Sequence, residues 1–256
     1  MKIPKFTSAR YVQDDTAYRE RRVVSKDEFT SARQSEDCYR SREAFLKMKD
    51  QYPKKAALGK YLADYLKSLS AKSVLGLGSG ESFHEYAIKL AASEIRITAT
   101  DFDPFIVEKV SEFLPEIDNF EVFDIKKDDF NRFQNKYDTI LMVGVIYALS
   151  DDEIVGFFKR VISTGMKHIL VVTSLLPVSH GLRFYSIRFI GYNPLALFVK
   201  KHVSRIIGRP GRFHGWSRSE GEFARLIKKA GALKLHKIIS LKPVSETEVL
   251  LHITPI

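Results

Sequence analysis

The chain has 256 residues, a formal net charge of +10, 45% hydrophobic residues and a single cysteine, Cys38. This length favours one large α/β domain with additions, and the hydrophobic content excludes a disordered protein. One cysteine excludes an internal disulfide and favours a reducing cytosol, and the apolar runs are too short for a secretory signal or a bilayer span. We therefore expect a cytoplasmic protein that is soluble or in peripheral contact with the inner membrane surface.

The first part of the chain is polar and charged, with little sustained periodicity. It predicts an irregular or loosely helical N-terminal extension, residues 1–50, which precedes a main domain of residues 51–256. The extension fits a solvated arm. Alternatively it is a flap over a ligand site, with Tyr39, Arg40 and Arg42 as candidate contacts.

Apolar and β-branched runs then alternate with helical patterns, which implies a parallel sheet covered by helices on both faces. The expected strands are residues 73–77, 95–101, 120–124, 137–143 and 168–173. The expected helices are residues 56–69, 82–93 and 104–113, and one that begins at the capping box Ser150-Asp151-Asp152-Glu153.

The alternation breaks at residues 176–216, an aromatic and basic insertion. A helix over 219–230 and two strands, 233–241 and 248–254, complete the predicted elements. Most of the positive charge lies around the insertion, because residues 154–219 contain eleven Lys or Arg residues and no Asp or Glu.

The first predicted strand ends in a glycine-rich stretch, Ser73-Val74-Leu75-Gly76-Leu77-Gly78-Ser79-Gly80-Glu81-Ser82, and a helical pattern with Phe83, Tyr86, Ala87 and Leu90 follows. A tight turn of this kind lets a ligand approach bare backbone and face the N–H groups that open the helix. The same stretch also fits a tight strand-to-helix turn that binds nothing.

Acidic residues follow the next two predicted strands. Asp101 comes twenty-one positions after Gly80, about where an acid can accept hydrogen bonds from a ribose diol. Asp101 could also cap the following helix, and the two roles are compatible. Ligands of an open parallel sheet bind beyond the carboxyl ends of its strands, where this sequence has Gly78 and Gly80, Asp101, Asp124, and Gly144.

In this order the motifs resemble those of the class I S-adenosylmethionine-dependent methyltransferases, in particular methyltransferases of types 11 and 12. The resemblance covers residues from about 56 to 175 and, more loosely, 217–254. It is carried by the glycine-rich stretch, by Asp101-Phe102-Asp103-Pro104, by Phe123-Asp124-Ile125 and by the run from Lys136 to Leu149.

The resemblance implies a three-layer Rossmann-like fold whose sheet has seven strands, mostly parallel, with the last strand antiparallel and the C-terminal hairpin supplying strands six and seven. It also implies an enzyme with S-adenosylmethionine as cofactor, in which Asp101 binds the ribose and Asp124 the adenine amino group. The cofactor-binding residues that it implies are Gly76, Leu77, Gly78, Ser79, Gly80, Asp101, Phe102, Asp124, Ile125, Val143 and Gly144.

Two positions depart from the pattern of the family. The family often has an acid where this chain has Gly76, and its third loop glycine is here Ser82. A dinucleotide-binding loop would need glycine at position 81 or 83, and these positions hold Glu81 and Phe83, which disfavours a dehydrogenase.

Methyl transfer depends mainly on orienting the donor methyl group against a nucleophile, so a general base is needed only for a hydroxyl or an acidic carbon. The candidate catalytic residues are Tyr147 past the fourth strand, His180 past the fifth and His214 near the end of the insertion. Either histidine could serve as a base, and each by itself also fits a surface or packing role. The sequence predicts no covalent nucleophile and no metal site.

The insertion mixes large apolar residues with cations, and residues 195–207 predict a basic amphipathic helix. Such a helix suits a membrane surface, a lipid-linked anion or a nucleic acid, and it also suits a lid with a solvated cationic face. We predict transfer of a methyl group to a small or lipid-linked anionic acceptor, with residues 176–216 as a lid and 182–209 as a possible membrane contact. The alternatives are an RNA methyltransferase or RNA-binding protein that uses residues 154–219, and a peripheral membrane protein with a non-catalytic scaffold.

Overall fold

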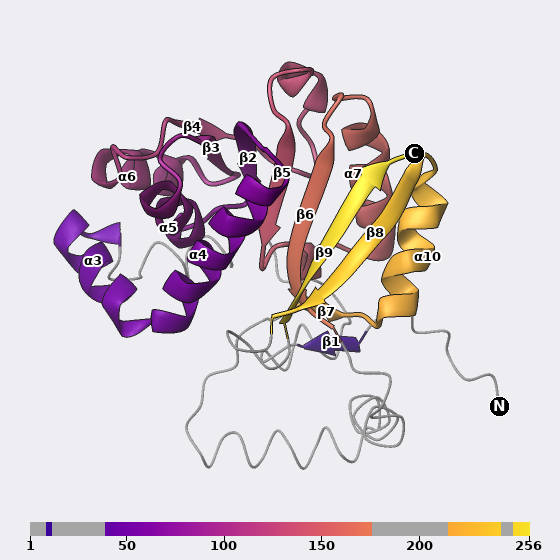
Figure 1. Cartoon of the computed structure of the whole chain (residues 1–256), viewed down its shortest axis with the longest axis horizontal. Helices are drawn as coiled ribbons and strands as arrows, with labels where there is room; N and C mark the ends of the chain where they lie inside the picture. The colour runs from indigo at the N-terminus through magenta and orange to yellow at the C-terminus, as the bar shows by residue number, and fades with distance from the viewer. Residues whose placement is uncertain (1–8, 12–38, 176–214, 242–247) are drawn as a thin grey trace, which may run out of the picture.

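The structure is a computed structural model, and it describes residues 9–11, 39–175, 215–241 and 248–256 (Figure 1). Its main sheet contains β2 (Ser73–Leu77), β3 (Arg96–Asp101), β4 (Asn119–Val122), β5 (Thr139–Val143), β6 (His168–Ser174), β8 (Leu233–Ser240) and β9 (Glu248–Pro255). The helices are α3 (Arg42–Gln51), α4 (Pro53–Ser68), α5 (Phe83–Ala91), α6 (Pro104–Phe113), α7 (Asp151–Ile162) and α10 (Glu220–Ala230). Two 3-10 turns, η2 (Phe130–Phe133) and η3 (Ile146–Ala148), lie between them.

The seven strands lie in the order β4-β3-β2-β5-β6-β9-β8. β9 is antiparallel to both of its neighbours, and the strands from β4 to β6 are parallel. This confirms the predicted Rossmann-like sheet, with β8 and β9 as its sixth and seventh strands. The chain runs from β2 to β3 and β4 on one side and returns to β5 on the other, so the switch point for ligand binding lies between β2 and β5.

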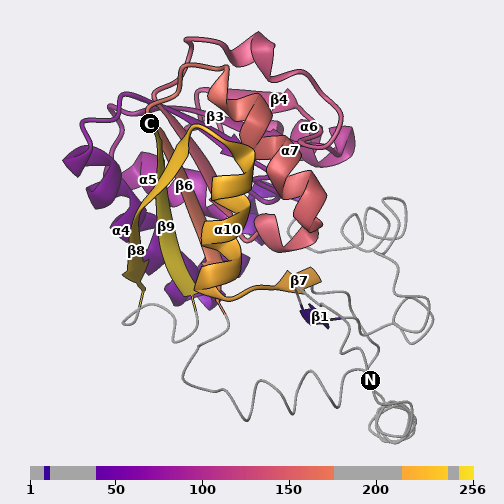
Figure 2. The ribbon, with the colours of Figure 1, turned by 90° about the vertical axis from the view of Figure 1, so that its right-hand side faces the viewer.

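Both faces of the sheet are covered. Val74 of β2 packs in the cluster that contains residues of α3, α4, α5 and α6, whereas Leu75 and Leu77 pack in the cluster with α7 and α10. Figure 2 shows α7 and α10 on the side of the sheet that faces the viewer. Burial on both faces is the reason why the central strands are continuously apolar in sequence.

The start signals of the helices act as predicted. Ser150 and Glu153 form the expected capping box at the start of α7. Ser219 and Glu222 form a second box at the start of α10. Because each box satisfies two N–H groups that a helix leaves unpaired at its start, these two boundaries are fixed locally.

The buried face of α5 differs from the predicted one at its end. Leu90 is 59% exposed, whereas Glu85 and Ile88 are buried beside Phe83 and Tyr86. The helix packs along α4, and its orientation there turns Leu90 outward and Glu85 toward the end of β2. Leu90, although one of the apolar positions of the helical pattern, is therefore not part of the buried face.

A small second sheet joins two distant segments. β1 (Ala9–Tyr11) pairs antiparallel with β7 (Gly215–Ser217), with Ala9 opposite Ser217. An isolated bridge between Leu175 and Arg218 places this pair at the end of the main sheet where β6 finishes, as Figures 1 and 2 show. Sequence patterns do not predict these strands, because three residues are too few to show a period.

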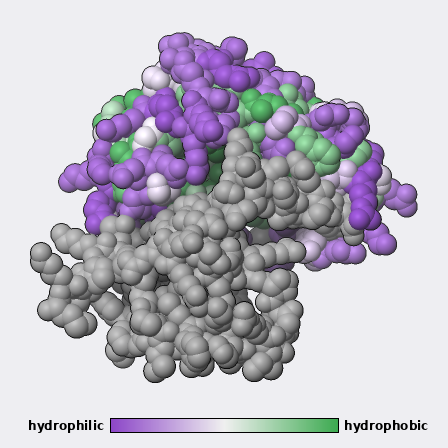
Figure 3. Space-filling model, turned by 180° about the vertical axis from the view of Figure 1, so that it is seen from behind, coloured by the Kyte–Doolittle hydropathy of each residue, from purple (hydrophilic) through white to green (hydrophobic). Residues whose placement is uncertain are grey.

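The described surface is mostly hydrophilic where Figure 3 shows it, with apolar side chains in small areas. Within the described part of the chain, the exposed large apolar residues are Tyr52, Leu90, Val122 and Ile256. No helix in the same residues is both long and apolar enough to cross a bilayer. The apolar content of these residues therefore serves mainly the two cores.

A histidine cluster lies on the strands β6, β8 and β9. His252 Nε2 is 3.0 Å from His168 Nδ1, and its Nδ1 is 2.9 Å from the Tyr65 hydroxyl of α4. Burial, and then the neighbouring His168, His236 and Lys237, lower the pKa of His252 to about 4. The unfolded chain therefore binds more protons than the folded chain between about pH 6.5 and pH 4, so stability falls as the pH falls through this range.

Acidification from pH 7.5 to pH 5 is expected to remove about 1–2 kcal/mol of unfolding free energy through His252. Urea unfolding of the wild type and of His252→Gln at both pH values measures this, because all other titrating groups are common to the two proteins. The glutamine side chain is not ionisable, so the variant should lose less stability on acidification than the wild type does. Equal losses in the two proteins would contradict the assignment to His252.

Candidate functional site

The loops that follow β2, β3 and β5 meet at one edge of the sheet. The parallel register places Leu77 beside Thr100 and Gly76 beside Leu141. The Phe123 N–H donates to the Asp101 carbonyl at 2.8 Å, which brings the end of β4 to the same edge. The predicted site residues that follow these strands therefore lie along one edge of the sheet, with the glycine loop and Gly144 at the switch point itself.

The glycine loop leaves β2 through three left-handed residues. Gly78, Gly80 and Ser82 have φ of +66°, +55° and +55°. The Ser79 N–H donates to the Thr100 carbonyl at 2.8 Å, which anchors the loop to β3. Ser82, in the place of the third loop glycine of the family that the sequence resembles, adopts the conformation that a glycine adopts at least cost.

The loop touches the segment after β5. A Cβ atom added to Gly78 would lie 2.8 Å from Val145 Cγ2 and 3.0 Å from Val145 Cγ1. Real Cβ atoms essentially never show a contact below 3.0 Å, so a side chain at position 78 would require Val145 or the loop to move. Position 78 thus requires glycine for both its dihedral angle and its packing.

Asp101 ends β3 and holds the glycine loop. Its side chain is buried, with Oδ2 accepting from the Gly80 N–H and Oδ1 from the Asp103 N–H, both at 3.1 Å. The cap of α6 is Asp103, which accepts from the Phe105 N–H at 3.1 Å. The alternative that Asp101 caps this helix is therefore wrong. Phe102, the next predicted cofactor residue, is half-buried and follows Asp101 directly.

Asp124 and Ile125 lie in the loop after β4. Asp124 is half-buried and its Oδ1 accepts from the Lys126 N–H at 3.0 Å, whereas Ile125 is buried in the α7-side core. A pocket of about 280 Å³ lies between this loop and α7. It is lined by Ile125, Lys126, Leu149, Asp152, Glu153, Gly156 and Arg160.

The segment after β5 carries Val143, Gly144 and Tyr147. The Gly144 N–H donates to the Val172 carbonyl at 3.0 Å, and Gly144 has φ of +65°. Tyr147 lies in η3, where its ring is 3.8 Å from the Cβ position of Gly144, and η3 lies against β7. The other two catalytic candidates, His180 and His214, lie outside the described residues.

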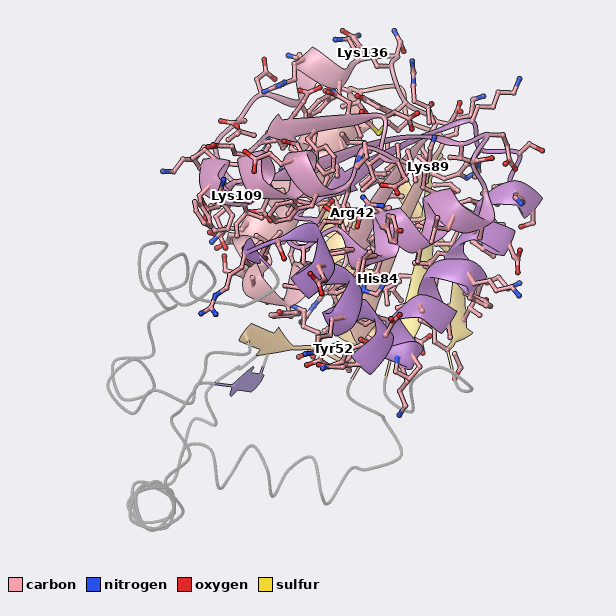
Figure 4. The ribbon with its side chains drawn as sticks, turned by 90° about the vertical axis from the view of Figure 1, so that its left-hand side faces the viewer. Arg42, Tyr52, His84, Lys89, Lys109 and Lys136 are labelled. Atoms are coloured by element: carbon pink, nitrogen blue, oxygen red, sulfur yellow. The ribbon has the colours of Figure 1, made fainter. Side chains whose placement is uncertain are left out.

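A charged pair joins α4 to the glycine loop and was not predicted. The Lys55 ammonium lies 2.5 Å from Glu81 Oε1 and 4.9 Å from the centre of the Phe83 ring. Burial opposes ionisation of Glu81, yet Lys55 keeps the pKa of this carboxyl below its usual value. Burial also lowers the pKa of the nearby His84 to about 4. Figure 4 shows His84 on the face formed by α3, α4 and α5.

The candidate flap contacts are placed away from the glycine loop or in the core. Arg42 hydrogen-bonds to the Phe113 carbonyl and to Glu116, at the end of α6. Tyr39 is buried in the core cluster, and Arg40 is exposed. The expectation that Arg42 contacts a ligand is therefore corrected, because its guanidinium group serves to attach α3 to the domain.

Glu85 of α5 is a second acid near the loop that sequence reasoning missed. It is 3% exposed, and its Oε1 accepts from the Ser79 hydroxyl at 2.8 Å. Burial raises the pKa of Glu85 to about 7, and the charges of Glu81 and Asp101 add to the rise. No sequence signal marked it, because a glutamate within a helical pattern is ordinarily read as solvent-facing.

Arg218 is a buried cation at the same end of the sheet. Its Nε donates to Asp151 Oδ1 at 2.8 Å and one terminal nitrogen donates to the Leu149 carbonyl at 2.7 Å. The side chain is 1% exposed, and its guanidinium carbon lies 5.8 Å from the centre of the Phe223 ring. Arg218 thus ties the segment after β5 to the start of α10.

No protein-family model and no curated protein matches the chain. Solved structures do match. Human N-acetylserotonin methyltransferase in complex with SAM matches at a TM-score of 0.58 and 18% identity, over 93% of this chain and 62% of that chain. The mitomycin 7-O-methyltransferase MmcR matches at a TM-score of 0.56 and 21% identity, over 78% of this chain and 54% of that chain.

Magnesium protoporphyrin IX methyltransferase from Synechocystis PCC 6803, with bound SAH, matches at a TM-score of 0.53 and 11% identity. That match covers 79% of this chain and 84% of the other. The chain spans only 54–62% of the length of the first three structures that it matches. These likenesses show that the described domain has the fold of class I methyltransferases.

Proposed function

We propose that the chain is an S-adenosylmethionine-dependent methyltransferase. The observation that carries the proposal is that the glycine loop and Gly144 lie at the switch point of a sheet with the methyltransferase fold, while Asp101 and Asp124 follow the next two strands at the same edge. The structures in which human N-acetylserotonin methyltransferase binds SAM and the Synechocystis enzyme binds SAH support the choice of cofactor.

The residues at this edge fit the cofactor chemically. Asp101 already accepts backbone N–H groups, and each carboxylate oxygen can accept more than one hydrogen bond, which suits a ribose diol. Asp124 would accept a hydrogen bond from the adenine amino group, and Phe102 and Ile125 are the apolar residues that follow the two acids in the chain. Gly78 leaves the backbone bare where a side chain would collide with Val145.

The cofactor, when bound, supplies an electrophilic methyl group on a sulfonium. The chain's own contribution is to hold the donor against the acceptor, and orientation of this kind can lower a barrier by about 7–11 kcal/mol. Tyr147 borders the end of β5, where it would face the acceptor. His180 and His214 are the candidate bases for a hydroxyl or acidic carbon acceptor.

We further propose a small or lipid-linked anionic acceptor, bound under residues 176–216 as a lid. The charge of residues 154–219 supports this choice. Three of its cations are engaged elsewhere, because Arg160 bonds the Ile125 carbonyl, Lys167 pairs with Asp138 and Arg218 pairs with Asp151. The other cations of this segment, which we assign to the acceptor, are Lys159, Arg183, Arg188, Lys200, Lys201, Arg205, Arg209 and Arg212.

Calorimetric titration with S-adenosylmethionine and with S-adenosylhomocysteine tests the donor. The wild type should bind both, and Asp101→Asn should weaken binding by about 10- to 100-fold, as expected for a lost hydrogen bond to a charged group. Binding of neither ligand by the wild type at millimolar concentration would overturn the proposal.

Asp138→Asn is the matched control. Asp138 Oδ2 accepts from the Lys72 and Ser73 N–H groups at 2.9 and 3.2 Å, so it ties backbone at the opposite, amino end of the sheet. Its replacement should leave donor affinity within about twofold of the wild type. Equal weakening by Asp138→Asn and Asp101→Asn would show that the effect is general and not a ribose contact.

Transfer of a labelled methyl group to fractionated cell extract tests the acceptor. Label in small anionic or lipid fractions supports the proposal. Label in RNA, with binding that weakens steeply as salt rises, would favour nucleic acid instead. Flotation with anionic liposomes separates a lipid-linked acceptor from a soluble one.

A further inference from the structure

Beneath the glycine loop, a carboxylate fills the space that a side chain at position 76 would take. A Cβ atom added to Gly76 would lie 2.7 Å from Glu85 Oε1 and 2.8 Å from Ser79 Oγ. Gly76 and Val74 face the same side of the sheet, the side that α5 covers. The loop therefore has an acid below it that comes from the helix and not from the strand.

This carboxylate is buried in an environment that is already negative. Glu85 is 3% exposed, and beside hydrogen bonds from a backbone N–H and from the Ser79 hydroxyl, the charges that act on it are the carboxylates of Glu81 and Asp101. Lys55, a cation near the loop, pairs with Glu81 at 2.5 Å. A buried carboxyl group is costly to ionise unless a positive charge comes to it.

We propose that Glu85 provides, from α5, the anionic group that the strand end lacks at Gly76, and that it binds the positively charged methionyl end of the methyl donor. The inference rests on the proposed function. The donor carries an ammonium group at one end and a ribose diol nearer the other, so two acids at the loop have two different tasks. Asp101 accepts from the Gly80 N–H and binds the ribose, while Glu85 accepts from the Ser79 hydroxyl and binds the ammonium group.

Donor binding should then release a proton near neutral pH. The carboxyl group of Glu85 is about half protonated at pH 7, since its pKa is raised to about 7, chiefly by burial. A cation that binds beside it favours the ionised form. Titrations at pH 7 in buffers of different ionisation enthalpy should therefore show release of up to about half a proton, and Glu85→Gln should abolish that release.

Three ligands locate the contact on the donor. S-adenosylmethionine and S-adenosylhomocysteine have the ammonium group, whereas 5′-methylthioadenosine has the adenosine and lacks the amino-acid part. Glu85→Gln should weaken binding of the first two by about tenfold or more and change the third by less than about twofold. Asp101→Asn should weaken binding of all three.

The outcomes separate the two claims. If Glu85→Gln weakens all three ligands equally, or none, the assignment of Glu85 to the methionyl end is wrong while the donor site stands. If the wild type binds none of the three, the proposed function itself fails and this inference with it.

Moving the acidic side chain from position 85 on α5 to position 76 on β2 gives a second test. Gly76→Asp alone should impair binding, because the new side chain meets Glu85 and the Ser79 hydroxyl. Glu85→Ala removes the buried acid and should also impair it. The double variant Gly76→Asp/Glu85→Ala returns an acid to the strand and should bind S-adenosylmethionine at least about tenfold better than Glu85→Ala, a gain of about 1.4 kcal/mol, so that the coupling between the two changes is larger than this gain. If the losses of S-adenosylmethionine affinity in the two single variants simply add in the double variant, and thermal unfolding shows that each protein is folded, then Glu85 does not stand in for an acid at position 76.

Discussion

Gly78→Ala is expected to abolish donor binding and to lower the free energy of unfolding by about 2–4 kcal/mol. Two costs add at this position. Gly78 has φ of +66°, which a residue with a Cβ atom adopts at a cost of about 1–2 kcal/mol. The new methyl group would also lie 2.8 Å from Val145 Cγ2, so that the loop or the segment after β5 must move. Urea unfolding and calorimetric titration of the variant measure the two effects.

Gly221→Ala is the control. Gly221 lies in α10, and a Cβ atom there would meet nothing within 4 Å. Alanine in a helix is favoured over glycine by about 0.5–1 kcal/mol, so this variant should be slightly more stable and bind the donor normally. Adding Val145→Ala to Gly78→Ala should recover only the packing part of the loss. Wild-type stability and binding in Gly78→Ala would contradict the geometry of the loop.

Arg218→Met is expected to cost about 2–4 kcal/mol of unfolding free energy. The guanidinium group is 1% exposed and donates to both Asp151 and the Leu149 carbonyl, so its removal takes one hydrogen bond from each of these two acceptors. The lower part of the usual range for a broken buried pair applies, because Asp151 is 24% exposed and can be rehydrated. Urea unfolding at pH 7.5 measures the loss.

A second ion pair on the same turn of α7 provides the comparison. Lys229 and Asp152 are 3.5 Å apart with side chains that are 62% and 94% exposed, so Lys229→Met should change stability by less than about 0.5 kcal/mol. Asp151→Asn combined with Arg218→Met should cost less than the sum of the two single changes, because the partners interact. Similar small effects at Arg218 and Lys229 would show that burial does not decide the strength of the pair.

The regular elements could be predicted because their signals are local. The apolar runs of β2, β5 and β6 and the capping box of α7 contain the information that fixes them. The strand order needed more than local signals, since no residue pattern states which strands are neighbours. The resemblance to a family supplied the seven strands and the antiparallel last strand, which the sheet confirms, and the structure adds the order of the strands.

The site was predicted only where its residues follow strands. Asp101 and the loop glycines could be found because a strand end and its spacing mark them. Glu85 could not, because a glutamate within a helical pattern is ordinarily read as solvent-facing, and only the packing of α5 on α4 and β2 turns it inward. Arg218 is similar, since its partners Asp151 and Leu149 lie far away in the sequence.

The position of β9 has a consequence for the order in which the sheet forms. β9 lies between β6 and β8, and β8 pairs with β9 alone within the described residues. β8 therefore cannot join the sheet before β9 docks on β6, although it precedes β9 in the chain. β6 and β9 are much farther apart in the chain than β2 and β3 are, so docking of β9 on β6 carries a larger entropic cost than the pairing of β2 with β3. We infer that the half of the sheet that contains β2, β3 and the glycine loop can assemble first, and that the edge formed by β9 and β8 completes the domain last.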